Sequence, residues 1–162
     1  MLNMNKLHMN STVLEQEKVT REEMVRLLNE DLTREYQAII AYVVYSQVLK
    51  GAAYMKIAKE LEKHAAEELV HALKISKQID YFGGMPGVAP KKVMTSEDPK
   101  RMLQFDLENE KETIRNYRQR IQQADAMGEF ALSEVLREIV VQEQEHLIDL
   151  ATALGIQSPE ID

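Results

Sequence analysis

The chain has no cysteine and no tryptophan among its 162 residues. Without cysteine it cannot form disulfides, thiolate zinc sites, iron–sulfur clusters or cysteine nucleophiles, and nothing points to an oxidising compartment. Glycine (6 residues) and proline (4 residues) are also scarce, which argues against a disordered or collagen-like chain. Because 44% of the residues are hydrophobic, a chain of this length can bury a sizeable core. We therefore expect a single, mostly helical domain.

Long apolar segments and an excess of positive charge are missing as well. The longest apolar run covers residues 38–45 and is far shorter than a membrane span, and the first 18 residues lack the apolar stretch of a signal peptide. The formal net charge is -7, and Lys6 and Lys18 are the only basic residues among the first twenty. Binding to nucleic acid requires clustered basic residues. We expect a cytoplasmic protein that binds neither a membrane nor DNA.

Hydrophobic residues recur at helical spacing in four segments. The first segment begins after the candidate N-cap Thr20 and ends near residue 50, and the second covers residues 54–82. The third begins after Ser96 or Asp98 and ends near residue 127, and the fourth follows Gly128 and ends near residue 155. The sequence therefore predicts four long helices.

The connecting segments predict how these helices are arranged. The first and last connections are short, so each joins two antiparallel neighbours. Residues 83–99 hold three of the four prolines and are long enough to span the bundle. We predict an all-α four-helix bundle in which two antiparallel hairpins are joined by a long crossover. Residues 20–155 form this domain, residues 1–19 a flexible N-terminal extension that includes His8, and residues 156–162 a short C-terminal tail.

An internal repeat relates the two predicted hairpins. Shifting the sequence by 75 positions makes seven of the seventeen residues in 26–42 identical to their counterparts. The same shift superimposes the only two Glu-x-x-His motifs of the chain, each of which follows a lone glutamate by 33 residues. The paired residues are Glu35 with Glu110, Glu68 with Glu143, and His71 with His146.

The helical pattern directs all six of these side chains towards the core. Buried carboxylates without countercharge cost roughly several kcal/mol each, and no Lys or Arg occupies the corresponding inward positions. Two divalent cations would balance four carboxylates. Residues at positions i and i+3 share a helix face, so Glu68 and Glu143 can bridge two ions while His71 and His146 bind one each. Carboxylate and imidazole ligands suit iron or manganese better than copper, with zinc as a substitute, and we predict two iron ions per chain.

These residues resemble the ligand set of the ferritin superfamily, and the chain is most similar to bacterioferritin over residues 28–154, including the segment YFGGMPGVAPKKV. The resemblance implies a ferroxidase that oxidises Fe(II) with O2 or H2O2 and stores ferric mineral in a homo-oligomeric cage, with roles in iron homeostasis and oxidative stress. It also implies that Glu68 and Glu143 are the bridging ligands.

Two departures from bacterioferritin alter these expectations. Leu69 stands where bacterioferritin has a haem-ligating methionine, so we expect no haem. Only sixteen residues follow His146, too few for the fifth helix of 24-subunit ferritins. We therefore favour a Dps-like cage of twelve subunits that carries a bacterioferritin-type site.

Further candidates surround the predicted ligands. Tyr42 and Tyr117 lie two turns beyond Glu35 and Glu110, where a phenol can hydrogen-bond a ligating carboxylate; Tyr42, which matches a tyrosine of bacterioferritin, is the stronger candidate. His64 is either an auxiliary ligand or a packed histidine. Four more acidic residues either line a cavity or are simply solvated: Glu60, Glu67, Asp80 and Glu145.

Two other functions remain open. A rubrerythrin-like or manganese-catalase-like enzyme could use a similar dinuclear site to consume peroxide without storing iron. A DNA-protecting protein is disfavoured by the acidic charge.

Overall fold

The computed structural model describes residues 18–162, so residues 1–17 of the expected N-terminal extension, His8 among them, lie outside it. The described part contains four long helices and no strand: α1 (Arg21–Val48), α2 (Met55–Tyr81), α3 (Pro99–Met127) and α4 (Phe130–Leu154), with a short 3-10 helix, η1 (Ala52–Tyr54), before α2. The all-α class is confirmed, and each boundary falls within about two residues of the predicted one. None of the helices of this part is long and apolar enough to cross a membrane.

The helix ends follow from local side-chain and backbone chemistry. The Thr20 hydroxyl accepts a hydrogen bond from the Glu23 backbone N–H, as the sequence predicts. Asp98, rather than Ser96, caps α3, because its carboxylate accepts from the Lys100 N–H and proline occupies the first helical position. Gly128 ends α3 in the left-handed region with φ at 76°.

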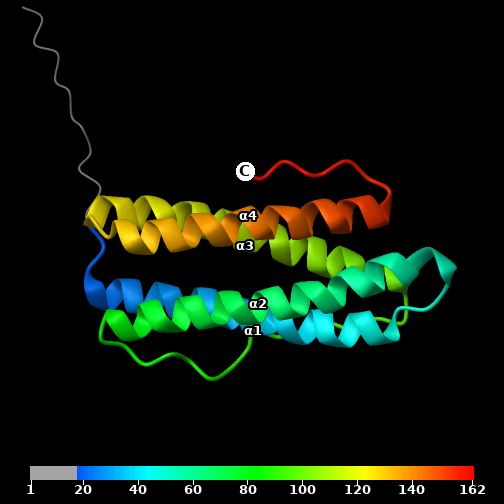
Figure 1. Cartoon of the computed structure of the whole chain (residues 1–162), viewed down its shortest axis with the longest axis horizontal. Coiled ribbons are helices and arrows are strands. Elements are labelled where there is room, and N and C mark those ends of the chain that lie inside the picture. Colours follow the sequence, from blue (N-terminus) through cyan, green and yellow to red (C-terminus); the bar gives the residue numbers. More distant parts are fainter. Residues whose placement is uncertain (1–17) are drawn as a thin grey trace, which may run out of the picture.

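The two hairpins lie against each other as layers of one bundle, α1 with α2 and α3 with α4 (Figure 1). The segment between α2 and α3 runs the length of the bundle and packs on α1. Lys91 donates its backbone N–H to the Thr33 carbonyl at 2.9 Å, and the Gln37 amide donates to the Lys92 carbonyl at 2.6 Å. The predicted crossover is therefore an ordered part of the fold.

The hydrophobic core is divided into two clusters. On α1 the first cluster includes Leu28 and Leu32 and the second begins at Ala41, with Glu35 between them. α2 and α4 also pass from one cluster to the other through their own predicted ligands, and on α3 Glu110 lies between Leu107 and Ile114 of the second cluster. The apolar clusters thus hold the polar residues in a layer at mid-bundle.

Residues 156–162 contain no helix and fold back over the second hairpin (Figure 1). Arg118 donates to the Ile161 carbonyl at 2.9 Å, and the Ile161 side chain packs on the second core cluster. The expected tail is therefore held against the bundle by specific contacts.

Candidate metal centre

The structure brings all six predicted ligands together at the centre of the bundle. Each of them is at most 3% exposed. Their potential ligand atoms form two groups, each within 4.8 Å: Glu35, Glu68, His71 and Glu143; and Glu68, Glu110, Glu143 and His146. Glu68 and Glu143 belong to both groups. The arrangement is that of two adjacent cation positions that share two carboxylates.

The contacts of the two imidazoles distinguish shared from unshared carboxylates. His71 Nδ1 lies 2.9 Å from Glu68 Oε2, 3.3 Å from Glu143 Oε1 and 3.5 Å from Glu35 Oε2. His146 Nδ1 lies 3.0 Å from Glu68 Oε1, 3.2 Å from Glu143 Oε2 and 3.7 Å from Glu110 Oε1. Glu68 and Glu143 thus present one oxygen to each imidazole, whereas Glu35 and Glu110 serve one side each.

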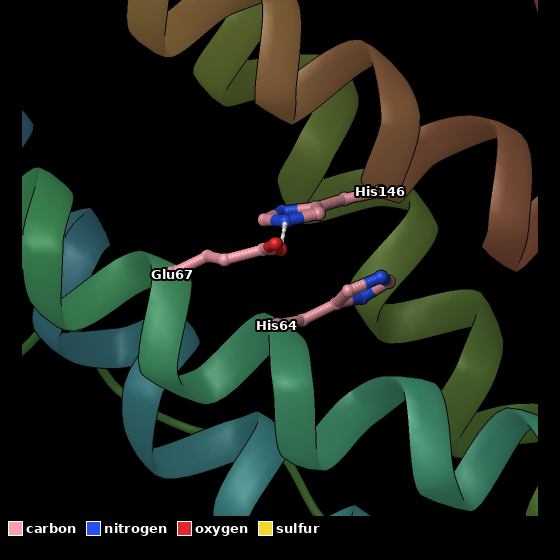
Figure 2. Close-up of side chains that lie close together, drawn as sticks. All are labelled: His64, Glu67 and His146. Carbon is pink, nitrogen blue, oxygen red and sulfur yellow. Dashed lines mark hydrogen bonds and ion pairs between the residues drawn. The ribbon is translucent and has the colours of Figure 1, made fainter.

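The outer nitrogen of each imidazole is held by the other hairpin. His71 Nε2 lies 2.7 Å from Gln142 Oε1, and His146 Nε2 lies 2.8 Å from Glu67 Oε2, as Figure 2 shows for the second pair. Gln142 is the counterpart of Glu67 in the repeat of 75. These contacts fix the ring orientations and leave both Nδ1 atoms facing the carboxylates, the second-layer arrangement that is usual for metal-binding histidines.

Both predicted tyrosines reach a carboxylate of the opposite hairpin. The buried Tyr42 hydroxyl donates to Glu110, and the buried Tyr117 hydroxyl donates to Glu35. The sequence favoured Tyr42, but the structure gives Tyr117 the equivalent contact. Each unshared carboxylate is therefore positioned by a phenol.

Burial and mutual repulsion shape the protonation of the carboxylates. Burial, together with the neighbouring carboxylates Glu143 and Glu35, raises the pKa of Glu68 well above its usual value. Burial and the charge of Glu143 raise the pKa of Glu110 to about 8. Burial also opposes ionisation of Glu143, but the hydrogen bond from His146 and the nearby imidazole of His71 outweigh it and lower the pKa of that carboxyl.

The imidazoles respond in the opposite sense. Burial disfavours the imidazolium form of His71 and His146, but the three carboxylates near each ring outweigh burial and raise both pKa values. Without a metal, protons on these rings supply part of the countercharge of the centre.

Those protons do not satisfy every carboxylate oxygen. Glu35 Oε2, Glu68 Oε1 and Glu143 Oε1 are buried and accept no hydrogen bond from residues 18–162, although an imidazole nitrogen lies 3.0 to 3.5 Å from each. An Nδ1 atom carries at most one hydrogen, so it cannot serve three oxygens at once. A cation between these oxygens can contact all of them, and the donor set therefore fits two divalent metal ions.

The remaining candidates have different surroundings. His64 is buried, stacks on His146 with 4.0 Å between ring centroids, and has its Nε2 3.1 Å from Asp149 Oδ2. Burial and the adjacent His146 lower the pKa of His64 to about 4, which leaves its ring neutral at pH 7. Glu60 and Glu67 each join His64 in a group of potential ligands, whereas Asp80 and Glu145 are exposed and join none among the described residues.

The structure also reveals a buried ion pair that the sequence argument missed. Arg120 Nε donates to Asp31 Oδ2 at 2.8 Å, and both side chains are buried. Arg120 lies outside the seam positions at which the sequence has no Lys or Arg, and its charge is matched by Asp31 rather than by the predicted ligands. Asp106, the repeat counterpart of Asp31, is buried without such a partner, and burial raises its pKa. In the sequence, the sign that both aspartates matter was that they are identical residues at equivalent positions of the repeat.

Known proteins share this architecture. The profile of the family described as Ferritin-like domain matches residues 25–157. Bacterioferritin of Brucella melitensis biotype 1 is 26% identical over 136 residues, or 82% of this chain and 83% of that protein, and bacterioferritin of Streptomyces coelicolor is 27% identical over 83% and 81%. A ferritin-like, diiron-carboxylate protein from Bacillus anthracis has a TM-score of 0.79 and 31% identity over 83% of this chain and 96% of that chain. Rhodobacter capsulatus bacterioferritin, at 24% identity, shares the fold with a TM-score of 0.76. The profile spans most of the chain, and this protein therefore belongs to the ferritin-like domain family.

Proposed function

We propose that this protein is an iron-storage and detoxification protein that oxidises Fe(II) at a dinuclear centre within each chain. The observation that carries the proposal is that Glu68 and Glu143 belong to both groups of potential ligand atoms at the centre of the bundle. Bacterioferritins are among its relatives, which supports iron as the metal.

The proposed substrates are two ferrous ions and one oxidant, O2 or H2O2. Each ferrous ion gives up one electron, and the oxidant takes up both. Glu35 and His71 hold one ion, Glu110 and His146 hold the other, and Glu68 and Glu143 span the two. Four carboxylates favour the more highly charged ferric product over the ferrous substrate. Tyr42 and Tyr117 keep the unshared carboxylates in place through their hydrogen bonds.

Storage requires a shell of many chains, and the surface of α2 supports association. Leu69, Val70 and Leu73 form an exposed apolar strip on this helix, where 52%, 47% and 63% of their areas are accessible. We propose a homo-oligomeric cage without haem, in the cytoplasm, with twelve subunits favoured over twenty-four and with no DNA bound. Manganese and zinc are the expected substitutes for iron.

Replacing Glu68 and His71 by alanine tests the proposed chemistry. The double variant Glu68→Ala, His71→Ala removes a shared and an unshared ligand, and we expect Fe(II) oxidation to slow at least about a hundredfold. The bundle should stay folded, because the change removes buried charge, and its metal-free form should be no less stable. Stopped-flow absorbance with O2 and with H2O2 measures the rate, circular dichroism measures the fold, and Glu62→Ala on the exposed face of α2 is the control. An unchanged rate in the double variant would place the chemistry elsewhere.

The mass of the assembly separates storage from the peroxide-consuming alternative. Size-exclusion chromatography with light scattering should give the mass of a shell that retains ferric iron. A dimer that consumes peroxide and retains no mineral would instead support a rubrerythrin-like or manganese-catalase-like enzyme.

A further inference from the structure

A second group of potential metal ligands lies next to the six residues of the centre. Glu60 and His64 are one turn apart on α2, and Asp149 faces them from α4. Potential ligand atoms of these three side chains lie within 4.8 Å of one another. The group shares no residue with the dinuclear centre.

His64 supplies an observation independent of the two acidic residues. Its side chain is 1% exposed, one ring nitrogen lies 3.1 Å from Asp149, and the other, Nδ1, has no hydrogen-bond partner among residues 18–162. The ring is held between His146, on which it stacks, and the edge of Tyr42, whose ring centroid lies 5.2 Å away. The imidazole is thus fixed in place, and Nε2, which faces Asp149, is the nitrogen that a cation in this group would use.

The two carboxylates of the group connect it with solvent. Glu60 and Asp149 both line two surface pockets between α2 and α4, of about 260 and 340 Å³. Lys56 lines both pockets and Lys63 lines one of them, but the Lys63 ammonium lies 4.0 Å from Glu60 and is 65% exposed. An exposed pair at that distance contributes little, so a hydrated cation can reach both carboxylates and compete with the lysine.

The internal repeat shows that this group is not a duplicate of the centre. At the positions 75 residues away from Glu60, His64 and Asp149 stand Val135, Ile139 and Lys74. The other hairpin therefore has apolar and basic residues where this one has metal-ligand types. Glu67, which holds His146, likewise has the neutral Gln142 as its counterpart. Negative charge and ligand capacity are concentrated on the His146 side of the bundle.

We propose that Glu60, His64 and Asp149 form a separate mononuclear site for a divalent cation, beside the His146 half of the dinuclear centre. One imidazole nitrogen and two carboxylates suit Mn²⁺, Fe²⁺, Co²⁺ or Zn²⁺, with water completing the coordination. The inference concerns binding alone and does not require that the dinuclear centre oxidise iron.

Metal counting on the full-length, metal-free protein tests the site. Equilibrium dialysis against Co²⁺ or Zn²⁺, followed by elemental analysis, should give three ions per wild-type chain and two per chain for Asp149→Asn or Glu60→Gln, because affinity at this site falls about tenfold or more. Both substitutions preserve side-chain shape at partly exposed positions, and circular dichroism checks the fold. Glu145→Gln removes an acidic residue from one of the same pockets but not from the group, and it should still bind three.

Two results would overturn the proposal. In the first, the wild-type chain binds only two ions and the Asp149→Asn variant binds the same two. In the second, the wild-type chain binds three ions and both the Asp149→Asn and the Glu60→Gln variants still bind three. The double variant Glu68→Ala, His71→Ala distinguishes failure of the mononuclear site from failure of the proposed function. It changes only the dinuclear centre, so it should still bind the ion that depends on Asp149. A wild-type chain whose single ion is lost in Asp149→Asn would support the mononuclear site and contradict the dinuclear centre.

Discussion

Each unshared carboxylate of the proposed centre accepts a hydrogen bond from one residue of the opposite hairpin. Tyr42 donates to Glu110 and Tyr117 donates to Glu35, and both hydroxyls are buried. Because the four residues are related by the repeat of 75, the two contacts form a matched pair within one molecule.

Removing either hydroxyl should weaken the centre by a similar amount. Removing one partner of a buried hydrogen bond costs about 1–3 kcal/mol, so Tyr42→Phe and Tyr117→Phe should each lower the unfolding free energy of the metal-free protein by about that amount. Urea unfolding followed by circular dichroism measures the loss, with the partly buried Tyr36→Phe as the control. If only Tyr42→Phe had an effect, the equivalence of the two contacts would be contradicted.

Protons and metal ions compete for the same ligands. The raised pKa values of His71 and His146, and the pKa of about 8 for Glu110, mean that the metal-free centre holds protons at pH 7. Metal binding requires deprotonated ligands, so zinc should release protons at pH 7 and bind more tightly as the pH rises towards 8. Titration with Zn²⁺ in the presence of a pH indicator measures the release.

The same pKa shifts set the pH dependence of metal-free stability. A group whose pKa is higher in the folded than in the unfolded chain stabilises the fold below its unfolded value, and this contribution disappears as the pH rises through the folded value. Because the pKa of Glu110 rises from 4.5 to about 8 on folding, its contribution should make the melting temperature of the metal-free protein fall between about pH 5 and pH 8. Protein loaded with zinc should show a smaller fall, and an equal fall in both forms would contradict the assignment.

Among the structural elements, the crossover between α2 and α3 depends on one close approach. A Cβ atom added to Gly84 would lie 2.9 Å from Val25 Cγ2 and 3.2 Å from Ile79 Cγ2. The absence of a side chain there lets the end of α2 pack against the start of α1.

Gly84→Ala should therefore destabilise the fold through steric overlap. We expect a loss of about 1–3 kcal/mol, the usual cost of overpacking. Gly128→Ala is an informative comparison, because its Cβ meets open space but its φ of 76° is unfavourable, which costs about 1–2 kcal/mol. If an additional Val25→Ala restored the stability of Gly84→Ala but not of Gly128→Ala, steric overlap would be the cause.

The elements and the six central residues were predictable because they depend on local spacing. The caps at Thr20 and Gly128 and the helical hydrophobic pattern set the helix ends, and spacing of i and i+3 within a repeat pointed to the ligands. Contacts between helices were less accessible. Glu67 was one of several acidic candidates, and nothing in the sequence pointed to Gln142, because their contacts with the histidines depend on how α2 and α4 are rotated against each other.

At the scale of the whole molecule, the apolar strip of Leu69, Val70 and Leu73 faces solvent on the single chain. Large exposed apolar patches mark interaction surfaces, and the proposed shell would bury this one between copies. The bundle itself does not need these side chains for its core.

Charge on this strip should therefore prevent assembly without unfolding the chain. Leu69→Asp with Leu73→Asp should reduce the mass measured by light scattering, while circular dichroism shows an unchanged helix content. Val88→Asp, on the crossover and 94% exposed, is the control and should leave the mass unchanged. An assembly of wild-type mass in the double variant would rule out this strip as a contact between copies.

The pairing of His146 with Glu67, and of His71 with Gln142, makes the two halves of the centre unequal. An anionic neighbour strengthens an imidazole as an electron-pair donor more than a neutral amide does. We therefore expect the proposed position beside His146 to fill before the one beside His71 and to empty after it.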